Sequence, residues 1–164
     1  MKISFKLLAS LIVLLLIPGC ISNIFREPKP TFSDEIVLPE LNSNYSKLSD
    51  NVYPAWKNKQ TGNVISIISD CTTDHFNLKS VHALMSDSLD SVKVIEEKFS
   101  NILDKKSYFR KIQGSIEEKS IEIQSYSFQH AKCLYISSLA GKPEKLSLNI
   151  NEFKTFIQNI TFKK

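Results

Sequence analysis

Hydrophobic and polar residues change their spacing along the chain, and each spacing predicts a different element. Residues 64–69 (VISIIS) are rich in β-branched side chains and follow a turn at 60–63, where Gly62 can adopt a positive φ. A strand here has two faces, one with Ile65, Ile67, Ser69 and Cys71, the other with Val64, Ser66 and Ile68. Because both faces carry apolar residues, we expect this strand in the interior of a sheet.

Residues 78–92 follow a different pattern, in which apolar positions recur at spacings of three and four. This pattern predicts an amphipathic helix, with Asn77 or Asp74 as its N-cap. The predicted apolar stripe consists of Leu78, Val81, Met85, Leu89 and Val92. Alternation then returns over 92–99 and 107–116, which we predict to be strands.

The second half of the chain predicts a β-meander followed by a helix. A turn at 117–120 precedes two alternating stretches, 120–129 and 132–140, which form a hairpin around His130-Ala131. The closing helix has one apolar face, made by Ile150, Phe153, Phe156, Ile157 and Ile160. The order of elements predicts an α+β domain over 50–164, a mostly antiparallel sheet packed by helices as an α/β/α sandwich.

The N-terminus has the pattern of an export signal. Lys2 and Lys6 precede an apolar stretch of about 11 residues, Leu7–Ile17, whereas a membrane-spanning helix needs roughly 20. The next residues, Ile17-Pro18-Gly19-Cys20, resemble a bacterial lipobox. The resemblance implies cleavage between Gly19 and Cys20, removal of residues 1–19, and acylation of Cys20. An ordinary secretory signal with a chance cysteine, or a weak membrane anchor, remains the alternative.

A lipid on Cys20 would attach the protein to a membrane without any apolar surface on its domain. Ile21, rather than Asp, follows the modified cysteine. By resemblance to Gram-negative lipoproteins, this implies an outer-membrane location facing the periplasm. Residues 20–49 contain several prolines and no regular apolar period, so we predict a flexible tether with a coil span of roughly 30 Å. Residues 35–41 (EIVLPEL) are alternatively a short first strand or a partner-binding segment.

Two further cysteines, Cys71 and Cys133, lie in separate predicted strands. In an exported domain this arrangement favours a disulfide, which would close a loop of about 61 residues and add roughly 4 kcal/mol on the chain-entropy model. The alternative is a pair of buried free thiols. A catalytic redox pair is disfavoured because the chain has no Cys-x-x-Cys spacing.

Charge and motifs exclude several functions. Of the net charge of +4, two units belong to Lys2 and Lys6, and no block of Lys and Arg predicts nucleic-acid binding. The chain lacks a phosphate-binding loop, a Gly-x-Ser-x-Gly motif and a zinc-protease motif, so we predict no enzyme activity, no cofactor and no metal. The polar group Asp70, Asp74 and His75 favours a helix-capping loop over a cation site.

Three other side chains are candidate site residues. His82 lies near the apolar stripe of the first helix and is expected to be partly buried, and His130 is expected to be exposed in a turn. Trp56, the only tryptophan, either packs under the sheet or contacts a ligand or partner.

Three features resemble the PsbP-like and DcrB-like sandwich families, over about residues 50–162. They are the stretch YPAWKNKQTGNVISIISDC, the strand KCLYISS and the closing helix. They also resemble small bacterial lipoproteins of unknown function. The resemblance implies a sandwich fold shared by envelope-assembly and photosystem-assembly proteins. The predicted function is a membrane-anchored, non-catalytic envelope lipoprotein that binds a still unidentified envelope protein or assists assembly. The alternative is a tethered domain that binds a small ligand or lipid near Trp56.

Overall fold

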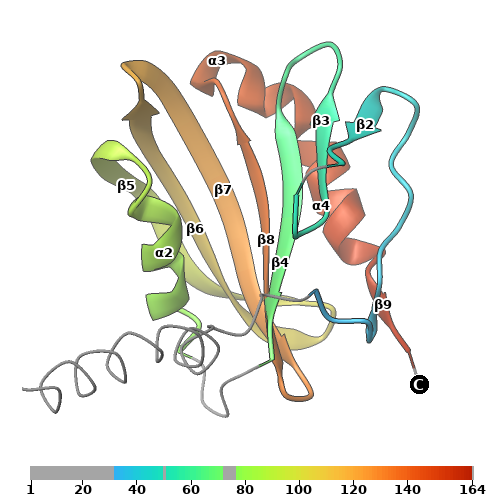
Figure 1. The fold of residues 1–164 in the computed structure, drawn as a ribbon. Coiled ribbons are helices and arrows are strands. Elements are labelled where there is room, and N and C mark those ends of the chain that lie inside the picture. The colour runs from blue at the N-terminus through green and yellow to red at the C-terminus, as the bar shows by residue number, and fades with distance from the viewer. Residues whose placement is uncertain (1–31, 50, 72–76, 164) are drawn as a thin grey trace, which may run out of the picture. The chain divides into compact units, whose positions relative to one another are not determined.

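The computed structural model describes residues 32–49, 51–71 and 77–163. Within these residues the main element is a seven-stranded antiparallel sheet in the order β2-β3-β4-β8-β7-β6-β5, with β1 and β9 paired separately (Figure 1). The strands are β1 Ile36–Val37, β2 Tyr45–Lys47, β3 Ala55–Asn58, β4 Val64–Asp70, β5 Asp90–Ile102, β6 Lys105–Ile116, β7 Lys119–His130, β8 Cys133–Gly141 and β9 Thr161–Phe162. The helices are η1 Ser80–His82, α2 Ala83–Ser86, α3 Pro143–Leu146, η2 Ser147–Asn149 and α4 Ile150–Gln158.

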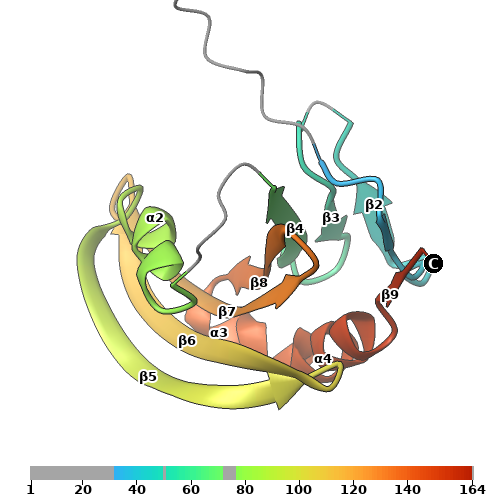
Figure 2. The ribbon, with the colours of Figure 1, turned by 90° about the horizontal axis from the view of Figure 1, so that it is seen from below.

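Helices cover both faces of the sheet. The α3 and α4 helices lie on one face and α2 on the opposite face, while the long strands β5 and β6 curve at the margin of the sheet (Figure 2). The predicted α+β sandwich is therefore confirmed. The predicted interior position of residues 64–69 is confirmed too, because β4 pairs with β3 on one side and β8 on the other. Gly62 has the expected positive φ of 79° in the preceding turn.

The main core lies between the sheet and the C-terminal helices. Phe128 and Tyr135 are opposite each other on β7 and β8, are fully buried, and stack with ring centroids 5.4 Å apart. The α4 helix contributes the predicted apolar stripe, in which Phe153, Phe156 and Ile157 are buried. Burial of this kind contributes about 1.5–3 kcal/mol per large side chain, so α4 is held mainly by its packing.

A second, smaller core lies on the other face of the sheet. Leu89 packs there against Ile112 of β6 and Ile123 of β7, with Met85 of α2 at the margin. The helix of this layer is much shorter than the one predicted over 78–92, because it ends at Ser86 and β5 begins at Asp90. A short isolated helix is only marginally stable in water. Pairing with β6 instead places the first residues of β5, which also fit a helical period, in a strand.

The domain also begins earlier in the chain than the sequence pattern placed it. The boundary was expected near Asp50, but β1 pairs with β9, β2 pairs with β3, and Ile36 and Tyr45 are buried. The alternative assignment of residues 35–41 as containing a short first strand is thus confirmed. Strands of two or three residues are too short to show a period, and β9, which pairs with β1, lies more than 100 residues away.

Candidate functional site: the β5 edge and its adjoining pocket

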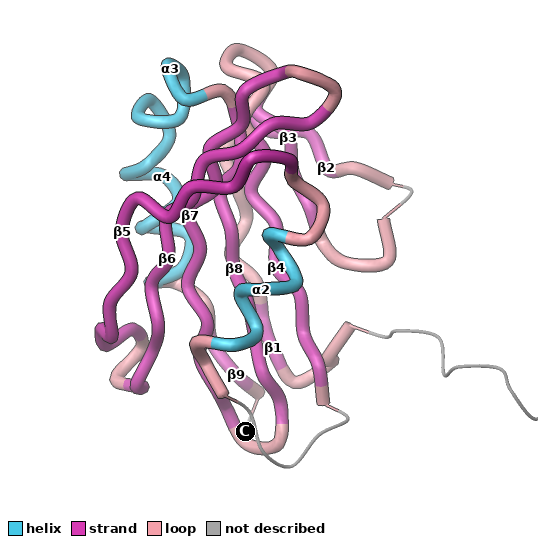
Figure 3. The backbone as a smooth tube through the Cα atoms, turned by 90° about the vertical axis from the view of Figure 1, so that its left-hand side faces the viewer, coloured by secondary structure: helices cyan, strands magenta, loops and turns pink. Residues whose placement is uncertain are grey.

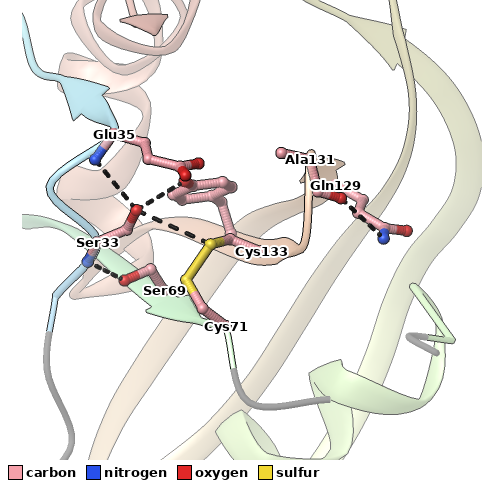
Figure 4. The surroundings of a disulfide bond; sticks show 8 residues. Ser33, Glu35, Ser69, Cys71, Gln129, Ala131 and Cys133 are labelled. Carbon is pink, nitrogen blue, oxygen red and sulfur yellow. Dashed lines mark hydrogen bonds between the residues drawn. A yellow bond between two sulfur atoms is a disulfide. The ribbon is translucent and has the colours of Figure 1, made fainter. Parts of the chain in front are cut away.

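The predicted disulfide between Cys71 and Cys133 is present. The antiparallel register of β4 and β8 pairs Asp70 with Leu134, so continuing it by one residue places the two cysteines opposite each other. Next to this bond the N–H of Ser33 donates to Ser69 Oγ (2.7 Å), and the Tyr135 hydroxyl donates to Ser33 Oγ (3.0 Å; Figure 4). The start of the described chain is therefore tied to this end of the sheet.

Trp56 and His130 each pack against a different aromatic ring. Trp56 of β3 is partly buried and its ring meets the edge of Phe156 at 5.5 Å, so its role in a ligand contact stays a prediction. His130 is half-buried and stacks on Phe162 at 3.8 Å rather than standing free in a turn. Five predicted site residues lie outside the described residues or at their margin: Gly19, Cys20, Asp74 and His75 are outside, and Asp70 ends β4.

His82 is buried on the α2 face, with 1% of its surface exposed. Its Nδ1 lies 2.8 Å from Ser125 Oγ and its Nε2 lies 3.0 Å from Ser127 Oγ, so both ring nitrogens have hydrogen-bond partners. Burial and the nearby Arg110 charge lower the pKa of His82 to about 4. The ring therefore remains neutral near pH 7 and serves to fasten η1 to β7.

The β5 strand forms one margin of the sheet. Within the described chain it pairs with β6 on one side, and nothing pairs with it on the other. Four of its apolar side chains are exposed to solvent: Val92, Val94, Ile95 and Phe99. The opposite margin is formed by β2, which has only three residues. Free strand edges with apolar side chains are sites where another chain can add a strand.

The first half of β5 is irregular and the second half is regular. Register shifts interrupt its pairing with β6 between Asp90 and Lys93 and between Val94 and Glu96, whereas pairing is continuous from Glu96 to Ile102. A two-residue turn with positive φ at both positions then leads into β6. In such a hairpin alternate residues direct their backbone N–H and C=O groups away from the partner strand. In the regular half of β5 these residues are Glu97, Phe99 and Asn101.

A pocket of about 560 Å³ adjoins the regular half of β5. Its lining comes from the β5–β6 hairpin, the end of β7 and the segment before η1: Asn77, Leu78, Phe99, Lys105, Lys106 and Gln129. Phe99 is 59% exposed and its ring packs on Tyr108 at 5.0 Å. The pocket therefore combines an exposed aromatic ring with cationic and amide groups.

Lys105 and Lys106 supply the charge of the pocket. Among the described residues, no carboxylate lies within ion-pair distance of either ammonium group, whereas Lys79 and Lys98 pair with Glu97 and Glu96 at 2.8 and 2.6 Å. The Lys106 ammonium lies 4.8 Å from the centre of the Phe99 ring, and that of Lys105 lies 5.5 Å from the Phe162 ring. Two lysines therefore line the pocket, and in the described part of the chain neither has a carboxylate partner within ion-pair distance.

Sequence reasoning found β5 as a strand but missed its role as an edge, and it missed the pocket altogether. Strand order depends on pairings across the whole chain, and no local pattern encodes it. The one local signal was the doublet Lys105-Lys106 next to an alternating stretch that ends in Phe99.

The described residues show neither a metal-binding cluster nor a membrane-spanning helix. In residues 32–49, 51–71 and 77–163, no three His, Cys, Asp or Glu side chains lie close enough together to hold a metal ion. Over these ranges no helix has the length and apolar character needed to cross a membrane.

The sheet order and the two helical layers form a sandwich fold like that of PsbP. Cyanobacterial PsbP (CyanoP) from Synechocystis sp. PCC 6803 superimposes with a TM-score of 0.51 over 80% of this chain and 84% of its own, at 9% sequence identity. LpqN of Mycobacterium tuberculosis, described as involved in cell envelope biogenesis, gives 0.59 over 88% and 97%, at 11% identity. PA94, a Pseudomonas aeruginosa protein of unknown function, gives 0.52 over 79% and 99%, at 16% identity.

At such identities the similarity establishes the fold alone. No protein-family model matches the sequence, and no curated protein matches it significantly.

Proposed function

We propose that this protein is a non-catalytic envelope lipoprotein, anchored through an acylated Cys20, that binds a protein partner by adding an extended segment of the partner to β5. The lipobox and the signal-like N-terminus support the anchor. A similar fold in LpqN, a protein involved in cell envelope biogenesis, is compatible with an envelope role. The outer membrane, facing the periplasm, is the location that Ile21 favours.

The observation that carries the proposal is the long open edge of β5. Within the described residues its only neighbouring strand is β6, and the regular half from Glu96 to Ile102 offers backbone donors and acceptors in strand geometry. Exposed Ile95 would be covered by side chains of an added strand. The charged residues and the register shifts of β5 are features that limit unspecific edge pairing, so a matching partner segment would be favoured over general aggregation.

Photo-crosslinking in cells tests the strand-addition proposal. A photoreactive residue at position 95 should yield a crosslink to one partner protein, because Ile95 is exposed on the edge. The effect of Ile95→Lys can be read from a photoreactive residue at position 92. The substitution should lower the crosslink yield about tenfold, because it removes roughly 1.4 kcal/mol of apolar contact with the partner.

Leu148 provides the matched control, since it is 67% exposed on η2, away from β5. A photoreactive residue at 148 should not capture that partner, and Leu148→Lys should leave the crosslink at position 92 unchanged. Equal crosslinks from positions 95 and 148 would contradict the assignment of the partner to β5.

The anchor has a separate test. Replacing Cys20 with serine should abolish incorporation of radiolabelled palmitate and release the protein into the soluble envelope fraction, because the thiol that receives the lipid is lost. Cys71→Ala/Cys133→Ala is the control for thiol loss and should still incorporate label. Label retained in the Cys20→Ser protein would contradict the lipoprotein assignment.

The alternative function, a tethered domain that binds a small ligand or lipid, was linked to Trp56. The pocket beside Phe99 now supports this alternative, because it combines a volume of about 560 Å³ with an exposed aromatic ring and polar groups, whereas the ring of Trp56 packs against Phe156.

A further inference from the structure

We propose that the pocket beside β5 binds the phosphate-bearing headgroup of an anionic membrane lipid. In this assignment Lys105 and Lys106 contact the phosphate, and Phe99 and Leu78 contact the adjoining apolar part of the lipid. The proposal rests on the lipid anchor described above and not on strand addition to β5.

The charges of the pocket favour a ligand that is anionic. Lys105 and Lys106 are adjacent in the chain, both line the pocket, and neither has a described carboxylate within ion-pair distance. Burial and the Lys105 charge lower the pKa of His130, so the imidazole next to the pocket carries less charge than an exposed one. The positive charge therefore belongs to the two lysines, which as compact cations suit phosphate oxygens.

The apolar lining favours a ligand that is more than a free anion. Phe99 is 59% exposed, and the Lys106 ammonium lies 4.8 Å from the centre of its ring. Leu78 lines the same pocket and is only partly buried. An exposed aromatic ring beside cationic groups is the combination that occurs where proteins meet the boundary between lipid headgroups and acyl chains.

The pocket lies at the end of the domain where the described chain begins. Lys105 lies over the ring of Phe162, and Phe162 is the β9 partner of Ile36. Ser33 is hydrogen-bonded to Ser69 at the end of β4. The β5–β6 turn, the β7–β8 turn and the β1–β9 pair accordingly lie toward one end of the sheet (Figure 3).

Chain length then limits how far this end can lie from an anchored bilayer. Eleven residues separate Cys20 from Phe32, so an acylated Cys20 would lie at most about 40 Å from the start of the domain. Such a short tether gives lipid headgroups a high effective concentration at the pocket, so weak binding to each phosphate would be sufficient. This argument favours a membrane lipid over an acidic protein segment as the occupant.

The experiment uses the mature chain with Cys20→Ser, isotopically labelled for NMR, so that the anchor itself cannot cause membrane contact. The probes are dihexanoyl phosphatidylglycerol below its micelle-forming concentration, dihexanoyl phosphatidylcholine, and inorganic phosphate. We expect phosphatidylglycerol to shift the resonances of Phe99, Lys106 and Gln129 saturably. Phosphatidylcholine and inorganic phosphate should bind the same site about fivefold or more weakly, since one lacks net charge and the other lacks apolar contact.

Variants locate the site. Lys105→Gln and Lys106→Gln should each weaken phosphatidylglycerol binding about fivefold, and Phe99→Ser should weaken it without altering the small response to phosphate. Lys154→Gln removes the same charge from the exposed surface of α4 and should leave binding unchanged. Ile95→Lys should also leave lipid binding unchanged, which separates this site from the partner edge.

Three results would overturn the proposal. The first is equal binding of inorganic phosphate and phosphatidylglycerol, which would make the pocket a phosphate site. The second is stronger binding of an acidic peptide than of the lipid at the same resonances, which would assign the pocket to a protein partner. The third is the absence of any saturable shift at Phe99 and Lys106. None of these results depends on whether β5 binds a partner or whether Cys20 is acylated in cells.

Discussion

Replacing both Cys71 and Cys133 with alanine is expected to lower the free energy of unfolding by about 4 kcal/mol. The disulfide joins residues 62 positions apart, and the cross-link lowers the conformational entropy of the unfolded chain by keeping the two ends of that loop together. For a domain whose total stability is about 5–15 kcal/mol, this is a large share.

Chemical denaturation of the mature Cys20→Ser chain, with and without reductant, measures the effect of the disulfide. The reductant should destabilise this chain by about the same 4 kcal/mol and should have no effect on the double alanine variant. Ser137→Ala, a single substitution elsewhere on β8, serves as a control and should retain its sensitivity to reductant. Equal midpoints with and without reductant would contradict a stabilising role for the bond.

The loss should be greatest at one end of the sheet. Cys133 is buried next to Ser33, and the cross-link holds the end of β4 against the start of β8. Hydrogen exchange should therefore become faster in residues 66–70 and 133–137 before it does so in β6. Uniformly faster exchange would indicate that the bond acts only through the unfolded state.

Acidification is expected to cost about 3 kcal/mol of stability through His82 alone. The pKa of this residue is lowered from 6.5 to about 4 in the folded protein, first by burial and then by the charge of Arg110, with Glu97 opposing the shift. Above pH 6.5 the ring is neutral in both states and the stability is fully present. As the pH falls from 6.5 to 4 the unfolded chain takes up a proton that the folded chain does not, so the stability falls.

The measurement compares unfolding free energies at several pH values for the wild type and for His82→Gln. The glutamine side chain has a donor and an acceptor for Ser125 and Ser127 but no titrating group. The difference between the two proteins should change by about 3 kcal/mol between pH 6.5 and pH 4 and be constant above that range. A constant difference over the whole range would show that His82 titrates alike in the folded and unfolded states.

Local patterns were sufficient where an element is defined by its own residues. The apolar period of residues 150–160 predicted the buried stripe of α4, and alternation around Ile65 and Ile67 predicted a strand covered on both faces. Gly62 marked the turn between β3 and β4 because a positive φ is costly for other residues. The prediction of a bond between Cys71 and Cys133 followed from the number of cysteines and the predicted export of the chain, with Cys20 as the predicted lipidation site.

Local sequence patterns were insufficient where the secondary structure of a segment depends on residues distant in sequence. Residues 78–92 fit a helical period, yet pairing with β6 draws their last part into β5. Residues 36–37 and 45–47 show no period at all, yet β9 and β3 make them strands. In both cases backbone hydrogen bonds to a segment remote in sequence outweigh weak local preferences.

The sequence by itself determined the sandwich class of the domain and the cysteines available for a disulfide, and it alone carries the predictions of an export signal and an acylated Cys20, because each depends on composition or short-range spacing. Only the tertiary structure decided which strand lies at the edge, and that Phe99, Lys105 and Lys106 meet Gln129 and Leu78 in one pocket. These features arise from the order of strands in the sheet. That order is fixed by the sum of long-range pairings and core packing, so no local stretch of residues contains it.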